Sequence, residues 1–511
     1  MRLHRRSRAF IAAILVTCFG VLVLAQGPGP NWFWSSLYHF LGATPPEPRF
    51  PIPPGLLDPS ERLRRWNEVA INATGLDHTP VQPGETRTFG EQLGPGRAAR
   101  AMAIVHIAMH DAINAIRGRY KTYTGIARGP LLASVDAAIA QAARDTLVAL
   151  FPSQRASFDR ELANDLARIP SLPTKTDGIS VGRRAAAAIL ALRANDGSQH
   201  LEPLLGEGYI PADDAGAWRQ DPISQLEVAL GARWGGVRPF VMSSGAQFRA
   251  PPPPALSSAQ YAAAYAEAQR LGGDGITTPT NRTAEQTFIG IFWAYDGTPS
   301  LCAPPRLYNQ LTMTIADRMG TTLDVVELAR LLALVNVAMA DAGIAIWESK
   351  FHYKLWRPVT AIRESDPGTG PTGAGDGNAA TRGDITFTPL GAPASNLVGP
   401  DFTPPFPTYP SGHAGIGGAL FQIMRRFYGT DRIAFQFVSD EFNGETRDND
   451  GTVRPLRPRS FSSFSQAEEE NGQSRIYLGI HWAFDKTAGI TQGRRVADLV
   501  FDRTFQRIGA L

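Results

Sequence analysis

The sequence predicts an all-α protein built as two four-helix-bundle-like halves with long irregular loops. Apolar residues recur at helical spacing in long segments rich in Ala, Leu, Arg and Glu. Strict alternation of apolar and polar residues, which is typical of half-buried strands, is almost absent. Helices with one apolar face bury that face by packing into bundles, so these observations together favour a bundle architecture.

The helical pattern falls into separate segments. By number they are 96–116, 131–150, 182–193, 257–270, 284–295, 306–318, 323–350, 412–428, 462–478 and 481–506. A first interruption, residues 196–256, divides them into an N-terminal helical region, 61–250, and a C-terminal helical region, 251–511, in which we expect any site to lie. A second one, residues 365–409, is rich in Gly, Pro, Thr and Asn. Loops of that length are uncommon in compact domains unless they are functional, so we expect this loop to contribute to a site.

Composition excludes some classes of protein. The 511 residues are 43% hydrophobic and 19% charged, as in ordinary globular enzymes, and the formal net charge is only +3. Basic residues are spread along the chain, so we expect no nucleic-acid partner. Any anion chemistry must therefore depend on a local concentration of positive charge. The sequence carries no signal for an oligomeric state.

The N-terminus has the pattern of a targeting segment. Basic residues among positions 2–8 precede an apolar run, 9–25, that ends before a Gly/Pro-rich stretch. We interpret residues 1–25 as a signal peptide or membrane anchor and residues 26–60 as an irregular arm rich in Pro and aromatic residues. No later stretch has the pattern of a spanning segment. We expect an exported protein, periplasmic or secreted, that contacts the membrane only through this N-terminal segment.

Three segments in the last third of the chain carry the residues that suggest chemistry. The first begins at Lys350 and reaches Arg357-Pro358 after six intervening residues. The second is the run 410–413, Pro-Ser-Gly-His. The third is Ser-Arg at 474–475, then five residues, His481, three residues and Asp485.

These segments offer the groups that bind a tetrahedral oxyanion. Lys350, Arg357 and Arg475 supply positive charge, and the planar fork of Arg matches such an anion. Ser411 and Gly412 lie where a loop enters a helix, so hydroxyl and backbone N–H groups would point at an anion there. We call Lys350, Arg357, Ser411, Gly412, Arg475 and His481 the oxyanion site.

Two histidines would set the chemistry at this site. His481 can bond the central atom through one ring nitrogen, while Asp485, one helical turn further on, holds the other nitrogen. His413 is the candidate acid–base group.

This ordered pattern resembles the superfamily of vanadium haloperoxidases and type 2 phosphatidic acid phosphatases, and every motif position is matched. The resemblance implies vanadate as the cofactor, with His481 as the axial vanadium ligand, and phosphate as an ion that fits the same site. It implies that His413 moves protons and that Lys350 polarises bound peroxide.

Further positions resemble the chloroperoxidase branch. Trp347 and Phe406 match an aromatic pair on the halide side, although both would also suit a plain core role. Asp296 matches an acid that pairs with a cationic residue of the site, here Arg475. The resemblance therefore implies oxidation of chloride or bromide by hydrogen peroxide to a hypohalous-acid equivalent, which halogenates a small organic substrate.

A soluble acid phosphatase is the alternative. His481 would then form a phosphohistidine and His413 would protonate the leaving group. Vanadate and phosphate have nearly the same shape, so the oxyanion site alone does not choose between the two activities.

Overall fold

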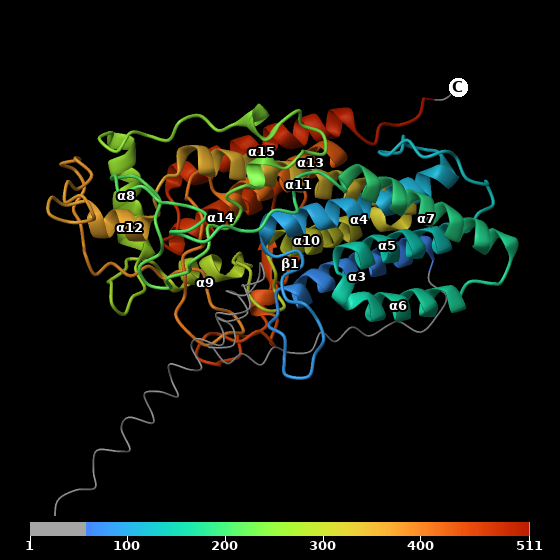
Figure 1. Cartoon of the computed structure of the whole chain (residues 1–511), viewed down its shortest axis with the longest axis horizontal. Helices are drawn as coiled ribbons and strands as arrows, with labels where there is room; N and C mark the ends of the chain where they lie inside the picture. The colour runs from blue at the N-terminus through green and yellow to red at the C-terminus, as the bar shows by residue number, and fades with distance from the viewer. Residues whose placement is uncertain (1–57, 510–511) are drawn as a thin grey trace, which may run out of the picture.

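Helices dominate the computed structural model, which describes residues 58–509 (Figure 1). Within that range the sheet structure is one antiparallel ribbon, in which β1 (Phe435–Phe437) pairs with β2 (Arg459–Phe461). The all-α prediction is confirmed. The predicted targeting segment and nearly all of the predicted arm lie outside the described residues.

The first group of helices packs at one end of the molecule (Figure 1). It comprises α3 (Pro59–Asp77), α4 (Gly94–Arg117), α5 (Val135–Leu150), α6 (Arg155–Ala167) and α7 (Pro173–Arg193). Helix α5 packs against α3, α4 and α7. Short 3-10 helices occur here and further along the chain: η1 (Pro152–Gln154), η2 (Trp234–Gly236), η3 (Gly245–Phe248), η4 (Thr321–Leu323) and η5 (Asp440–Phe442).

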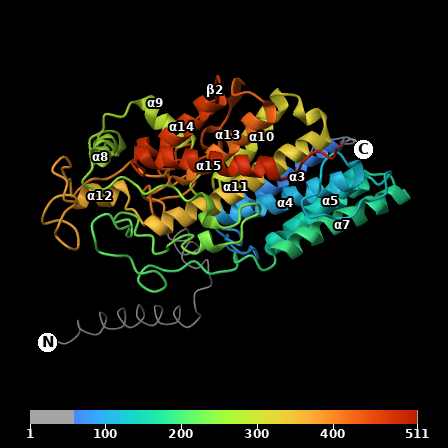
Figure 2. The ribbon, with the colours of Figure 1, turned by 90° about the horizontal axis from the view of Figure 1, so that it is seen from above.

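The remaining helices form the other end and the centre (Figure 2). They are α8 (Ala259–Gly272), α9 (Ala284–Phe292), α10 (Pro304–Arg318), α11 (Val325–Tyr353), α12 (Pro358–Glu364), α13 (Gly412–Tyr428), α14 (Phe464–Tyr477) and α15 (Ala483–Arg503). One apolar core includes residues of both groups. The proposed division at residue 250 stays a prediction.

Helix α11 is the central helix. Asp324 caps its N-terminus by accepting the backbone N–H groups of Val326 and Glu327. By length and composition α11 could cross a membrane, contrary to our prediction for this stretch, but 94% of its most apolar window is buried inside the protein. It packs against α4, α13 and α15, so its apolar surface is covered by other helices on several sides. Its last turn carries Lys350.

Helices α13 and α15 cross at glycine residues. A Cβ atom at Gly493 would lie 1.9 Å from the carbonyl oxygen of Gly415, and one at Gly489 would lie 2.7 Å from that of Ser411. The two backbones therefore touch with no side chain between them. The backbone N–H of Ser411 donates to the carbonyl of Asp485 at 3.0 Å. The N-terminal ends of both helices are thus held side by side.

Most predicted helices are present, and the differences have physical causes. Helix α3 was not predicted, although Asp58 and Glu61 form a capping box at its start. Helix α6 was missed because it buries little, with only Phe158 and Asp165 buried, and α12 because it is short. Helix α9 ends at Phe292, three residues before the predicted end, because the chain turns there toward the site.

Candidate active site

The predicted site residues converge from four parts of the chain. Helix α11 and the start of α12 bring Lys350 and Arg357, and the start of α13 brings residues 411–413. The end of α14 and the start of α15 bring residues 475–485, and the loop after α9 brings Asp296. These groups meet at and just behind a cavity lined by Asp296, Gly412, His413, Arg475 and His481.

Lys350 is fully buried. Its ammonium donates to the carbonyl oxygens of Pro407 and Thr408, both at 2.8 Å. Burial, together with the charge of Arg357, holds the pKa of Lys350 well below its usual range. A lysine has three N–H donors, so one stays available for an anion.

Arg357 lies against the imidazole ring of His481. Its Nε donates to the Phe406 carbonyl at 3.0 Å, and its Nη1 donates to the Ile480 carbonyl at 2.8 Å and to Nε2 of His481 at 3.1 Å. Burial lowers the pKa of Arg357 to about 9. Its Nη2 is buried and has no partner among the described residues.

His481 is held in one tautomer by its hydrogen bonds. Its Nδ1 lies 2.8 Å from the Asp485 carboxylate and 3.1 Å from the Thr408 hydroxyl, and Nε2 faces the Arg357 donor. We therefore assign the proton to Nδ1, so Nε2 is unprotonated and its lone pair accepts from Arg357. Thr408 also donates to Asp485. Burial raises the pKa of Asp485 to about 6.

Ser411 is the N-cap of α13, as predicted, and its hydroxyl oxygen accepts the backbone N–H of Ala414. Its O–H can still donate. Gly412 is the first helical residue, so backbone N–H groups and the positive end of the helix dipole lie at the site.

His413 follows in the first turn of α13. Its Nε2 donates to the carbonyl oxygen of Ala294, which leaves Nδ1 as the unprotonated nitrogen of the neutral ring. Burial and the nearby charge of Arg475 hold the pKa of His413 well below its usual range. Burial and the charge of Arg357 have the same effect on the pKa of His481.

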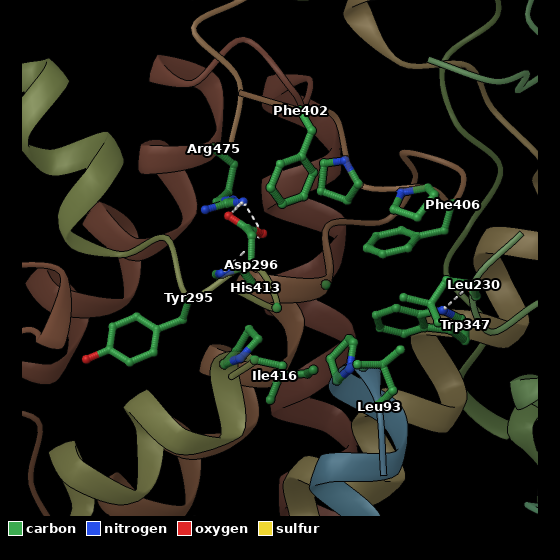
Figure 3. Close-up of a pocket in the computed structure, with 18 of the residues that line it drawn as sticks. Leu93, Leu230, Tyr295, Asp296, Trp347, Phe402, Phe406, His413, Ile416 and Arg475 are labelled. Atoms are coloured by element: carbon green, nitrogen blue, oxygen red, sulfur yellow. Dashed lines mark hydrogen bonds and ion pairs between the residues drawn. The ribbon is translucent and has the colours of Figure 1, made fainter. Parts of the chain in front are cut away.

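Arg475 and Asp296 form the ion pair that the resemblance implied (Figure 3). Nη2 of Arg475 donates to both carboxylate oxygens, at 2.7 and 2.6 Å. The same carboxylate lies 3.9 Å from Nε2 of His413. Burial raises the pKa of Asp296 above its ordinary value, although Arg475 opposes that rise.

The site has the donors for an oxyanion. Nε and Nη1 of Arg475, like Nη2 of Arg357, are buried nitrogens without a partner among the described residues. Buried donors are normally hydrogen-bonded, so three orphaned guanidinium nitrogens indicate an anionic guest. Across residues 58–509 no cluster of three or more His, Cys, Asp or Glu side chains could hold a metal cation. The residues present therefore fit vanadate or phosphate, which are anions, and do not fit a bare cation.

The other side of the cavity is apolar (Figure 3). Trp347 and Phe406 pack with ring centroids 5.0 Å apart, and the Trp347 indole donates to the Leu230 carbonyl at 3.0 Å. The apolar wall includes Leu93, Leu230, Trp347, Phe402, Phe406 and Ile416.

Sequence reasoning missed several contributors, among them Thr408, Phe402 and Leu93. Thr408 and Phe402 belong to the long loop 365–409, whose length was the signal, but no motif singled them out. Leu93 comes from the start of α4, about 250 residues before the first motif, and no sequence signal marks it. Cys302 is buried, and burial raises the pKa of its thiol to about 11.

Fold and site together define a helical-bundle protein with a preorganised oxyanion-binding centre. Vanadium chloroperoxidase of Curvularia inaequalis is 30% identical to this chain over 523 residues, covering 86% of this chain and 82% of that protein. The family described as the VCPO second helical-bundle domain matches residues 330–509. The chain belongs to the vanadium haloperoxidase family.

Solved crystal structures share the fold. The structure described as the first bacterial vanadium-dependent iodoperoxidase has a TM-score of 0.69 and 23% identity, covering 91% of this chain and all of that one. A bacterial vanadium-dependent chloroperoxidase in its holo form has a TM-score of 0.59 and 18% identity, covering 82% of this chain and 94% of that one.

Proposed function

We propose that this protein is a vanadate-dependent haloperoxidase that oxidises chloride or bromide with hydrogen peroxide. The observation that carries the proposal is the set of buried, unpartnered guanidinium nitrogens of Arg357 and Arg475 beside the lone pair of His481. Vanadate, when bound, supplies Lewis-acid activation of peroxide. The product is a hypohalous-acid equivalent that halogenates a small organic substrate.

The residues of the chain then have separate roles. Lys350, Arg357 and Arg475 bind the oxyanion and neutralise its charge, with Ser411 and the α13 N-terminus as further donors. His481 would be the residue that holds the vanadium of bound vanadate, and Asp485 keeps the proton of His481 on Nδ1. His413 accepts and returns a proton at Nδ1, because Ala294 retains the proton on Nε2.

We place the halide beside Trp347 and Phe406. Both rings lie near positive charge, with the Lys350 ammonium 5.1 Å from the centroid of Phe406 and 5.8 Å from that of Trp347. An apolar wall next to a cation suits a weakly hydrated anion. We also propose that the protein is exported, which the basic and apolar residues 1–25 support.

The decisive assay measures two activities of the purified full-length protein. With vanadate, peroxide and bromide or chloride, we expect halogenation of monochlorodimedone that disappears in His481→Ala. Without vanadate, hydrolysis of p-nitrophenyl phosphate should be slow. Fast hydrolysis inhibited by vanadate, with no halogenation, would instead establish a phosphatase.

A second variant tests the halide side. Phe406→His adds a hydrogen-bonding ring at the apolar wall, so we expect the ratio of kcat/KM for bromide and chloride to change while vanadate affinity stays near that of the wild type. Equal effects on both halides would place halide binding elsewhere.

A further inference from the structure

The segment that carries Asp296 has an unusual backbone. Helix α9 ends at Phe292, and three residues later Tyr295 adopts a backbone φ of 45°. Residues other than glycine rarely adopt such a positive φ. On either side of Tyr295 lie two groups of the site: the Ala294 carbonyl accepts from His413, and the Asp296 carboxylate binds Arg475. Something must stabilise this turn, because an unfavourable φ persists only when its surroundings enforce it.

Residues 439–441 hold the turn at three points. The Ser439 hydroxyl donates to the Phe292 carbonyl at 2.7 Å. The backbone N–H of Asp440 donates to the Tyr295 hydroxyl at 2.6 Å. The backbone N–H of Tyr295 donates to Oε1 of Glu441 at 3.2 Å, so this carboxylate binds the turn at its strained residue.

Glu441 is itself fixed from the opposite side. Its side chain is fully buried, and Oε2 accepts from the Ser395 hydroxyl at 2.6 Å and from Arg454. Arg454 is also buried and binds Asp448 through its other terminal nitrogen. The two oxygens of Glu441 therefore have different partners, since Oε2 binds the charged anchor and Oε1 binds the turn.

We propose that Glu441 is a positioning residue, which fixes the turn at Tyr295 and through it the places of the Ala294 carbonyl and the Asp296 carboxylate. It touches no reacting group; it acts through His413, whose tautomer the Ala294 carbonyl sets, and through Arg475. Ser395 belongs to the long loop 365–409, which in this way supports the site as well as lining it. The kinetic part of this inference rests on the proposed function.

The substitution Glu441→Gln tests the different roles of the two carboxylate oxygens. An amide offers one oxygen and one NH2 group, and the charge of Arg454 will hold the oxygen because hydrogen bonds to ions are the stronger ones. The NH2 group then faces the Tyr295 N–H, donor against donor, and the turn is released. We expect kcat to fall about tenfold or more, as is usual for residues that orient a ligand-holding group.

Arg454 provides the rescue. In Glu441→Gln/Arg454→Gln the amide oxygen is free to turn to the Tyr295 N–H, so kcat should recover although stability stays low. Arg454→Gln alone removes a buried ion-pair partner but leaves Oε1 of Glu441 and its bond from Ser395, so it should lower Tm and reduce kcat less than Glu441→Gln does. Glu468→Gln is a matched distant control, because Glu468 is a buried carboxylate bound by Arg425 and Arg494.

A second readout needs neither vanadate nor activity. The ring ¹⁵N shifts of His413, identified by their loss in His413→Gln, should show the Nε2–H tautomer in the wild-type protein and a mixture of tautomers in Glu441→Gln. The inference would be overturned if Glu441→Gln kept the wild-type kcat and the wild-type His413 tautomer. It would also be overturned if kcat did not recover in Glu441→Gln/Arg454→Gln. If Glu441→Gln does not fold, Ser395→Ala serves instead, because it removes one of the groups that fix Glu441. It should lower kcat and mix the His413 tautomers to a smaller extent, and no change in either would contradict the inference. A wild-type protein without halogenation would refute the proposed function, while the tautomer would still test Glu441.

Discussion

Thr408→Val is the most informative single change at the site. The Thr408 hydroxyl is fully buried, donates to Asp485 and lies 3.1 Å from Nδ1 of His481. Valine keeps the shape of the side chain and removes only the hydroxyl. Asp485 Oδ2 then keeps the bonds from His481 and the Trp482 N–H, while Oδ1 has no partner in the described part of the chain.

The magnitude follows from the lost hydrogen bond. A bond to a carboxylate contributes about 1.5 kcal/mol or more, and about 1.4 kcal/mol corresponds to one pKa unit. Burial already raises the pKa of Asp485 to about 6, and the Thr408 bond opposes that rise. Removing the bond should raise this pKa by about one unit. A protonated Asp485 holds the His481 proton less well, so vanadate affinity should fall about tenfold, most strongly at low pH.

The sign for stability follows from the same shift. Folding raises the pKa of this carboxyl, so ionised Asp485 favours the folded state less than protonated Asp485 does. In the vanadate-free protein its contribution to the free energy of unfolding therefore decreases as pH rises from about 4 through about 6. In Thr408→Val the decrease should continue to about one pH unit higher.

The assay measures vanadate affinity, and kcat/KM for peroxide, as functions of pH between pH 5 and 8. We expect the acid limb of both to move up by about one pH unit in Thr408→Val. Thr403→Val is the control, because the Thr403 hydroxyl is buried five residues earlier in the same loop and has no partner in the described structure. The reasoning is wrong if the two variants behave alike, or if affinity falls equally at every pH.

Two further predictions concern charge and stability. Burial and like charges lower the pKa values of Lys350, His413 and His481, and a bound anion opposes this lowering. Oxyanion binding should therefore take up protons, and calorimetry of phosphate binding in buffers of different ionisation enthalpy measures the uptake. Release of protons would contradict it. Asp341→Ala should lower the free energy of unfolding by about 3–5 kcal/mol in urea, because the carboxylate accepts the backbone N–H groups of residues 240–242 inside the core. A loss below about 1 kcal/mol would show that water replaces it.

The sequence made the charged part of the site predictable. The motif spacing identifies Lys350, Arg357 and Arg475. Ser411 was predictable because a Ser at the point where a loop enters a helix is typical of a helix N-cap. Asp485 was predictable because a four-residue spacing puts it on the same helix face as His481. Each of these residues has a chemical type that its role requires.

The rest depends on where the folded chain places ordinary side chains. Thr408 and Glu441 make their hydrogen bonds to partners that are distant in the sequence, and other loop residues of the same types look alike in the sequence. Leu93 becomes part of the wall only because α4 packs against α11. The end of α9 could not be predicted either, since the turn at Tyr295 is stabilised by residues that follow it by about 145 positions.

The backbone contact between α13 and α15 has a consequence for how this enzyme can change. His413 and His481 stand at the ends of two helices whose separation is set by main-chain atoms at Gly415, Gly489 and Gly493. Repacking of side chains elsewhere cannot alter that separation, and any larger residue at the crossing would push the helices apart. The two imidazoles thus keep a constant spacing, and if halide binds where we propose, adaptation to new halides is left to the wall around Trp347 and Phe406.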